Sequence, residues 1–334
     1  MVDRRMGWLG TVRAAVAWAM GMAIGMAGNT AVGAAPAAAA SATPTTLTVP
    51  AAPAAVASAA SAPTVRLAVV RVASLPVREG MLYSGGRFGE MATTNFSAFL
   101  IEHGGQRLLL DTGLGARIAQ QYAADMPHWG RPFFRAPEVV VPVRRQLDAA
   151  GVGTVQRIVL THAHWDHASV VEDFPGADIW AAEAELATVR AARSGIGSAW
   201  PSQVGSPALR WRALALSGPA FEGFERSEDL FGDGRVVAVP MAGHTPGSLG
   251  LFVTVSSGRR FFFVGDVVWT TLALAERRPK FWAARQLVDA DIERTQHTIG
   301  LIRAAQQRDP ALVVVPAHDA LVQDRLGYFP RWVE

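Results

Sequence analysis

The chain has 334 residues, which is enough for one large domain or two small ones. It contains no cysteine, and this excludes disulfide bonds, thiolate–zinc sites and a cysteine nucleophile. The formal net charge at pH 7 is only +3 and the sequence has no basic patch, so nucleic acid is not expected as a partner.

Residues 1–34 have the features of an export signal. Arg4 and Arg5 form a basic start, residues 14–28 form an apolar run, and the small residues at 32–34 offer a cleavage site. The apolar run is short and rich in Ala and Gly for a membrane span, which needs about 20 apolar residues. We therefore expect a cleaved signal peptide, no stable membrane span after its removal, and an exported protein, periplasmic or secreted. An uncleaved anchor is the alternative.

A second N-terminal segment, residues 35–63, consists almost entirely of Ala, Pro, Ser, Thr and Val and carries no charge. This composition has no helix or strand period and predicts a flexible, disordered linker. We therefore expect the folded domain over residues 64–334.

Within that domain, hydrophobic patterning predicts strands and helices that recur along the chain. In chain order we expect strands over residues 65–75, 94–104 and 106–115, a helix over 137–152, a strand over 156–160, a helix over 182–193, strands over 235–240, 249–255 and 259–266, a helix over 291–308, and a strand over 311–319. Gly104 and Gly105 separate the second and third strands and predict a hairpin turn. The recurrence of both element types favours an α/β domain in which helices cover sheets.

Five of the eight histidines stand just past the end of a predicted apolar strand, and one aspartate does the same after the sequence FFFVG. These residues are His162, His164, His167, His244, His318 and Asp266. Strand ends are rigid and present side chains at the rim of a sheet. We therefore expect these residues to converge on one site.

The sequence THAHWDH (161–167) predicts two metal ions rather than one. Its His-x-His pair places two imidazoles on the same side of an extended loop, while the neighbouring Asp166 and His167 face a different direction. We expect one ion to be held by His162, His164 and His244, the other by Asp166, His167 and His318, and both to be bridged by the carboxylate of Asp266. Nitrogen and oxygen ligands without sulfur suit two zinc ions, with manganese, iron or cobalt as alternatives.

Five segments, in this order, resemble the metallo-β-lactamase superfamily of hydrolases. They are LLLDTG (108–113), LTHAHWDH (160–167), GHTPGS (243–248), FVGD (263–266) and PAHD (316–319). The resemblance implies an αββα four-layer sandwich, in which two β-sheets lie face to face with helices outside. It also implies a dinuclear site at one edge and the ligand assignment given above. Asp111 matches an aspartate of the family whose carboxylate would accept a ring N–H from a ligand histidine.

For the activity, the resemblance implies a metal-dependent hydrolase in which two zinc ions share a hydroxide that attacks a substrate carbonyl. We expect Asp266 to bridge the two ions, and Asp166 to orient the hydroxide and collect its proton. The amino-acid sequences THxHWDH, GHTPGSLGL and PAHD most resemble those of the N-acyl homoserine lactonase branch. The leading hypothesis is therefore the opening of a lactone or ester in a small-molecule substrate, by a monomer or homodimer.

Two other branches of the superfamily stay open as alternatives. A β-lactamase subclass that uses only histidines and aspartate resembles the MAGHTPGS wording, but it generally lacks the bridging carboxylate. Organophosphate or arylester hydrolases of the same fold are the second alternative. The lactonase branch places a tyrosine three residues after the bridging aspartate, and this chain has Trp269 there. A binding or sensory protein without catalysis is disfavoured by the complete ligand set.

Aromatic side chains are the candidates for a substrate pocket. The candidates are Trp129, Phe133, Phe134, Trp269 and Trp282. The first three lie within residues 115–136, which we expect to form a flap near the site; they line an acyl-chain pocket or, equally well, pack the loop down. Trp269 is expected to form an apolar wall or to donate a hydrogen bond through its indole N–H, and Trp282 is expected to form a second wall.

Overall fold

The computed structural model describes residues 63–334. The signal peptide predicted over residues 1–34 lies outside this part, and so does the linker predicted over residues 35–63, apart from Pro63. No helix within the described part is long and apolar enough to cross a membrane.

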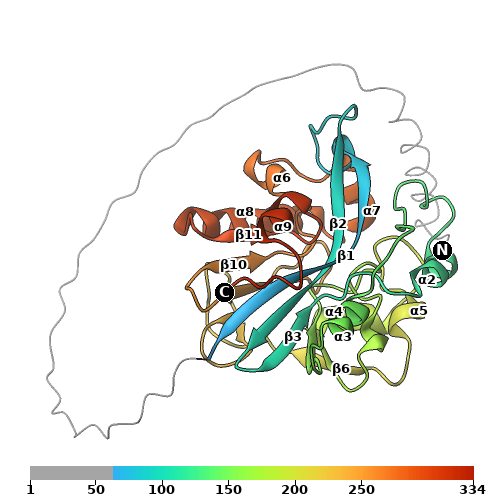
Figure 1. Cartoon of the computed structure of the whole chain (residues 1–334). Coiled ribbons are helices and arrows are strands. Elements are labelled where there is room, and N and C mark those ends of the chain that lie inside the picture. Colours follow the sequence, from blue (N-terminus) through green and yellow to red (C-terminus); the bar gives the residue numbers. More distant parts are fainter. Residues whose placement is uncertain (1–62) are drawn as a thin grey trace, which may run out of the picture. The chain divides into compact units, whose positions relative to one another are not determined.

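The first half of the described chain builds one sheet, whose six strands follow one another in chain order (Figure 1). They are β1 (Val65–Arg78), β2 (Met91–His103), β3 (Gln106–Leu110), β4 (Arg157–Val159), β5 (Asp178–Ala182) and β6 (Arg210–Leu214). The predicted hairpin is present, because β2 and β3 pair antiparallel up to His103 and Gln106. Gly104 and Gly105 form its turn with positive φ angles, which glycine adopts without steric cost. From β3 to β6 the strands run parallel.

The second half builds a sheet of five strands in the order β11-β10-β9-β8-β7. They are β7 (Glu228–Asp229), β8 (Val236–Pro240), β9 (Leu249–Thr254), β10 (Arg260–Phe263) and β11 (Val313–Val315). The strands from β7 to β10 are antiparallel, whereas β10 and β11 are parallel. The parallel pair requires a crossover, which contains the helix predicted near residues 291–308.

The helices of the described part are mostly short. They are α2 (Ile118–Asp125), α3 (Val143–Ala149), α4 (Glu183–Arg190), α5 (Pro201–Val204), α6 (Thr271–Ala275), α7 (Trp282–Val288), α8 (Ile292–Arg308) and α9 (Ala320–Leu326). The side chain of Asp291 caps α8 by accepting a hydrogen bond from the backbone N–H of Arg294, which fixes the start of the longest helix at the predicted position.

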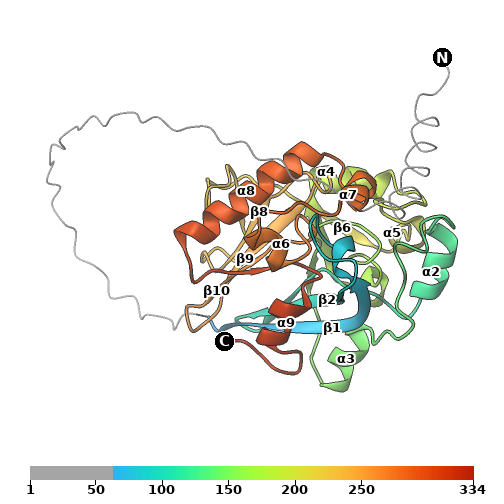
Figure 2. The ribbon, with the colours of Figure 1, turned by 90° about the horizontal axis from the view of Figure 1, so that it is seen from above.

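Alternation along β2 explains why the sheets pack face to face. Ala98 and Leu100 belong to a buried cluster that includes residues of α2, α3 and α5, whereas Phe99 and Ile101 belong to a cluster shared with the second sheet. Successive side chains of a strand point to opposite faces, so one sheet is buried on both sides. On the far side of the second sheet, Ile302 of α8 packs with a third cluster. Figures 1 and 2 show α8 along that sheet.

These layers confirm the predicted αββα sandwich. The prediction of a helix over residues 137–152 was too long, because only Val143–Ala149 is helical. Pro142 precedes the helix with an extended backbone, at φ −56° and ψ 146°. A proline ring disfavours the helical conformation at the preceding residue and has no N–H to donate, so the helix begins after it. Strands β5 and β6 were not predicted, because sequences such as DIWAA and RWRAL have no clear alternation.

Candidate metal centre

Two groups of metal-ligating side chains lie in the loops that follow strands β4, β8, β10 and β11. The first group is His162, His164 and His244, and the second is Asp166, His167, Asp266 and His318; within each group the ligand atoms lie within 4.8 Å of one another. Strands of both sheets contribute, so the groups lie where the two sheets end together. The structure thus brings together all seven residues that the sequence indicated. The two groups contain the two predicted sets, and Asp266, which was predicted to bridge them, falls in the second group.

Three ring nitrogens converge in the first group. The Nε2 atom of His244 lies 3.2 Å from Nε2 of His162 and 3.0 Å from Nδ1 of His164. The opposite nitrogen of His244 donates to the carboxylate of Asp289 at 2.8 Å. The opposite nitrogen of His162 lies 3.1 Å from the hydroxyl oxygen of Thr161. Because those outer nitrogens carry the protons, the inner ones face one another with lone pairs, which suits a cation between them.

The electrostatics of the first group favour neutral imidazoles. Burial lowers the pKa of His162 well below its usual value, and the neighbouring histidines lower it further. Burial and the proximity of His244 bring the pKa of His164 to about 3. Neutral imidazole is the form that binds a metal ion, so no proton has to be removed before an ion enters.

Asp266 lies between the two groups. Its Oδ1 atom is 3.3 Å from Nε2 of His167 and 3.1 Å from Nε2 of His318, both in the second group. Its Oδ2 atom is 3.9 Å from Nε2 of His244 in the first group. Asp166, also in the second group, has its Oδ2 atom 3.2 Å from Nε2 of His318. The carboxylate of Asp266 therefore faces both groups, one oxygen to each.

Two buried atoms of the second group have no hydrogen-bond partner within the described residues. They are Nε2 of His167 and Oδ1 of Asp266, which lie near each other without the alignment of a hydrogen bond. A buried polar atom without a partner is costly, and an ion that accepts both lone pairs would remove the cost. The donor set of nitrogen and oxygen atoms fits a divalent cation such as zinc.

The carboxylates make the second group strongly attractive to positive charge. Burial by itself lowers the pKa of His318, but the carboxylates of Asp266 and Asp166 outweigh it and raise the pKa to about 10. Burial likewise opposes the protonated form of His167, yet the carboxylates of Asp111 and Asp266 raise its pKa well above the usual value. The same carboxylates that stabilise protonated histidines would also stabilise a bound divalent cation.

Asp111 fixes the orientation of a ligand in the second group, as the resemblance implied. Its Oδ2 atom accepts from Nδ1 of His167 at 2.8 Å, and its carboxylate also accepts from the backbone N–H and hydroxyl of Thr161 at 2.7 and 2.8 Å. The sequence had placed Asp111 within a strand, but β3 ends at Leu110 because Asp111 adopts a left-handed backbone, with φ 55°. His318 is held differently, since its Nδ1 atom lies 2.7 Å from the backbone carbonyl of Asn95.

Trp269 contacts the carboxylate between the groups. Its indole N–H donates to Oδ2 of Asp266 at 3.0 Å. The donation expected of this indole N–H was toward a substrate, whereas in the structure its acceptor is a protein carboxylate. The contact fixes the rotation of the Asp266 carboxylate.

Three buried residues of the site were missed by the sequence analysis. Asp289 and Lys280 lie behind His244, with the Lys280 ammonium 2.5 Å from Oδ1 of Asp289. Glu185 accepts from the backbone N–H of Ala163 at 2.7 Å and from the hydroxyl of Thr245 at 2.6 Å, so it joins the loops that carry the first group. One feature of the composition could have drawn attention to Lys280: it is the single lysine among the 31 lysine and arginine residues of the chain.

The aromatic side chains proposed for the substrate pocket are all partly or largely exposed to solvent. Trp129 and Phe133 are partly exposed, and Phe134 is partly buried against the first sheet's helix-covered core. Trp282, at the start of α7, is 38% exposed. The assignment of these four side chains to a substrate pocket stays a prediction.

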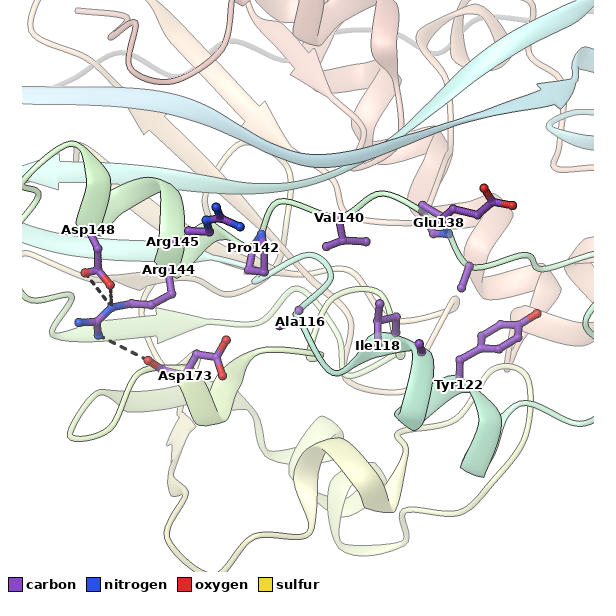
Figure 3. A pocket seen from close by; sticks show the side chains of 14 residues that line it. Ala116, Ile118, Tyr122, Glu138, Val140, Pro142, Arg144, Arg145, Asp148 and Asp173 are labelled. Atoms are coloured by element: carbon purple, nitrogen blue, oxygen red, sulfur yellow. Dashed lines mark hydrogen bonds and ion pairs between the residues drawn. The ribbon is translucent and has the colours of Figure 1, made fainter.

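A cavity of about 800 Å³ lies between α2, the segment before α3, and α3 itself (Figure 3). Residues 115–136, the predicted flap, contain α2 and form part of its lining. Ile118, Tyr122 and Val140 line its apolar part, and the ion pair of Arg144 with Asp148 borders its other end. The predicted flap aromatics and the metal-ligating residues are not among its lining residues. The cavity is thus built from different residues than the metal centre.

Comparisons with known proteins agree with this geometry. The sequence profile of the metallo-beta-lactamase superfamily matches residues 95–318. Two probable metallo-hydrolases, from Mycobacterium bovis and Mycobacterium tuberculosis, are each 30% identical to this chain over 240 residues, which cover 66% of this chain and 73% of the relative.

Solved structures with the same fold include two lactone-cleaving enzymes. One is an N-acyl homoserine lactone hydrolase with the product N-hexanoyl-L-homoserine at its catalytic metal centre; the TM-score is 0.61 at 15% identity, over 81% of this chain and 99% of that chain. The other is AidC, a dizinc quorum-quenching lactonase, with a TM-score of 0.52 at 15% identity over 77% of this chain and 88% of that chain. At this identity the similarity shows the fold.

Proposed function

The chain belongs to the metallo-beta-lactamase superfamily and is a metal-dependent hydrolase, and from this premise we propose that it uses two zinc ions to open lactone or carboxylic ester bonds. The observation that carries the proposal is the position of Asp266, whose two oxygens face the two ligand groups separately. A carboxylate in that position supports a dinuclear rather than a mononuclear site.

Each group of residues has its own task in this proposal. Divalent cations in the two groups would supply Lewis acidity, which polarises a substrate carbonyl and lowers the pKa of water. We assign the handling of the proton at the site to Asp166, a carboxylate within the second group whose Oδ2 atom lies 3.2 Å from Nε2 of His318. Asp111 and Asp289 keep their histidines in the orientation that presents the inner nitrogen.

N-acyl homoserine lactones are the substrate class that we propose first. Two features of the chain support this: the sequence of the histidine motif, and the complete set of histidine and aspartate ligands. The chain also shares its fold with enzymes whose bound product is N-hexanoyl-L-homoserine. A lactone or ester has a carbonyl to polarise and an alkoxide leaving group to protonate, and a site holding two cations would supply the Lewis acidity for this chemistry.

One contact favours a second candidate, an arylester or organophosphate hydrolase. The indole N–H of Trp269 is already donated to Asp266, so this side chain offers a substrate no hydrogen bond of the kind that a tyrosine hydroxyl gives. Its ring then serves as an apolar surface, which suits an aromatic leaving group better than a lactone.

A single assay separates these candidates. Purified full-length chain loaded with zinc is offered N-acyl homoserine lactones, penicillins, carbapenems, aryl esters and phosphotriesters, and acid release is followed in a pH-stat. Fast acid release from lactones alone supports the first proposal. Turnover confined to aryl esters or phosphotriesters supports the second, and fast release from β-lactams contradicts both.

We also propose that the protein is exported. The support is the basic start, the apolar run and the small residues within residues 1–34. N-terminal sequencing of the protein recovered outside the cytoplasm tests this: a start near residue 35 is expected, and an intact Met1 contradicts cleavage.

A further inference from the structure

Lys280 lies between α6 and α7 and is only 3% exposed. Lysine is rarely buried to this degree unless it is paired. The 30 other basic residues of the chain are arginines, yet this position holds the chain's one lysine. An ammonium is a compact point charge, whereas a guanidinium is a wide planar group, so the small space behind a ligand histidine suits lysine.

The ammonium of Lys280 contacts the partner of a ligand histidine. Its Nζ atom lies 2.5 Å from Oδ1 of Asp289, and the same oxygen accepts from Nδ1 of His244 at 2.8 Å. Nζ is also 3.0 Å from Nδ1 of His244. On its other side, Nζ lies 5.4 Å from the ring centroid of Trp269, which in turn holds Asp266. One buried positive charge therefore stands directly behind the first ligand group.

Behind the second ligand group stands a carboxylate whose other partner is neutral. There the carboxylate of Asp111 accepts from His167 and from Thr161, which is uncharged. A carboxylate partner increases the electron density that a histidine gives to a metal ion. Behind His167 the Asp111 carboxylate is shared with neutral donors of Thr161, whereas behind His244 the Asp289 carboxylate is shared with an ammonium. The two carboxylate–histidine pairs are thus electrostatically unequal.

We propose that Lys280 is a positioning residue that offsets the charge of Asp289, so that the first ligand group binds its ion less tightly and leaves that ion the stronger Lewis acid. The direction follows from Coulomb's law, since a fixed positive charge near a cation weakens the binding of that cation and withdraws electron density from the ligand between them. The inference rests on the proposed dinuclear site but not on the choice of substrate.

A purely structural role for the pair predicts something else. Lys280 precedes α7 and Asp289 follows it, so their ion pair also links the two ends of this helix. If that were the whole of their function, removal of either partner would loosen the segment and weaken metal binding in both cases. The proposed electrostatic role predicts opposite effects on metal affinity: removal of Lys280 should strengthen the binding of the ion, and removal of Asp289 should weaken it.

The test compares Lys280→Met and Asp289→Asn in the full-length chain, with zinc and cobalt affinities measured by competition with a chromophoric chelator. We expect Asp289→Asn to weaken the binding of one of the two ions about 10–100-fold. We expect Lys280→Met to strengthen the binding of the same ion on the order of tenfold. In the cobalt-loaded protein, the visible ligand-field bands of Lys280→Met should shift, because His244 becomes the stronger donor. Weaker binding in both variants, or unchanged bands and affinity in Lys280→Met, would overturn the proposal.

Lys280→Met leaves the buried Asp289 carboxylate without its cation and can fail to fold. The double variant, in which both charges are removed, avoids this cost. It should bind the ion more tightly than Asp289→Asn alone, and equal or weaker binding would contradict the proposal. Arg278→Met is the matched control, since it removes an exposed positive charge two residues away and should leave the affinity unchanged. If the wild-type chain itself binds no ion at the first group, the proposed function and this inference both fail. If the wild type binds the ion and both variants bind it more weakly, the inference alone fails.

Discussion

The indole N–H of Trp269 donates a 3.0 Å hydrogen bond to Oδ2 of Asp266, the carboxylate that faces both ligand groups. We expect Trp269→Phe to keep its metal and to lose about tenfold in kcat, because a hydrogen bond to a charged group contributes about 1.5–3 kcal/mol. Metal content by mass spectrometry and steady-state kinetics check this. Trp332→Phe is the matched control, since Trp332 contacts Phe329 and Arg66 rather than a ligand. Equal rates in both variants would contradict the role of Trp269.

Removal of a ligand should remove the metal together with the activity. His164→Ala takes one of three nitrogens from the first group, and Asp266→Ala takes the carboxylate that faces both groups. We expect His164→Ala to lose one equivalent of bound ion, Asp266→Ala to bind both ions poorly, and both variants to lose nearly all turnover. Equilibrium dialysis followed by metal analysis gives the stoichiometry. Full metal content with the wild-type rate in either variant would refute the ligand assignment.

Asp111 combines a charge with an unusual backbone conformation. Asparagine tolerates a left-handed backbone, so Asp111→Asn should keep the loop. It loses the negative charge behind His167 and one of the two oxygens that accept hydrogen bonds there. We expect metal affinity to fall about 10–100-fold. Asp111→Ala should also lower the free energy of unfolding, because it adds about 1–2 kcal/mol of backbone strain and leaves Thr161 without its acceptor. Chelator competition and urea unfolding measure the two effects, and identical stability losses in both variants would argue against the backbone contribution.

Glu185 should make the stability of the metal-free protein depend on pH. Burial raises the pKa of its carboxyl above the ordinary 4.5, although hydrogen bonds from Thr245 and backbone N–H groups counteract this. A carboxyl with a raised folded pKa stabilises the fold fully below pH 4.5, and this contribution is lost as pH rises through the folded pKa. Glu185→Gln cannot ionise, so it should gain stability relative to wild type over that interval. Urea unfolding of metal-stripped protein at several pH values checks the trend, and a constant or falling difference would contradict it.

Local patterns predicted the elements that have strong periodicity or clear boundaries. The β2–β3 hairpin follows from two apolar runs around Gly104 and Gly105, and α8 begins where Asp291 can cap it. The helix predicted over residues 137–152 is present only as α3, because Pro142 stops the helix from extending over the apolar residues before it. Strands β5 and β6 were missed because their own sequences give only a weak strand pattern. Their pairing partners, rather than their own weak patterns, make them strands.

The sequence by itself determined which residues could bind metal, because a His-x-His-x-Asp-His motif and polar residues after strands are visible in order along the chain. Only the tertiary structure decided what stands behind those residues. Asp289 lies 45 residues from His244 in the chain and yet 2.8 Å away in space, and Lys280 joins them from a different turn. Spacing along the chain reports the direction of a side chain only within one element, whereas contacts between loops depend on how the two sheets pack.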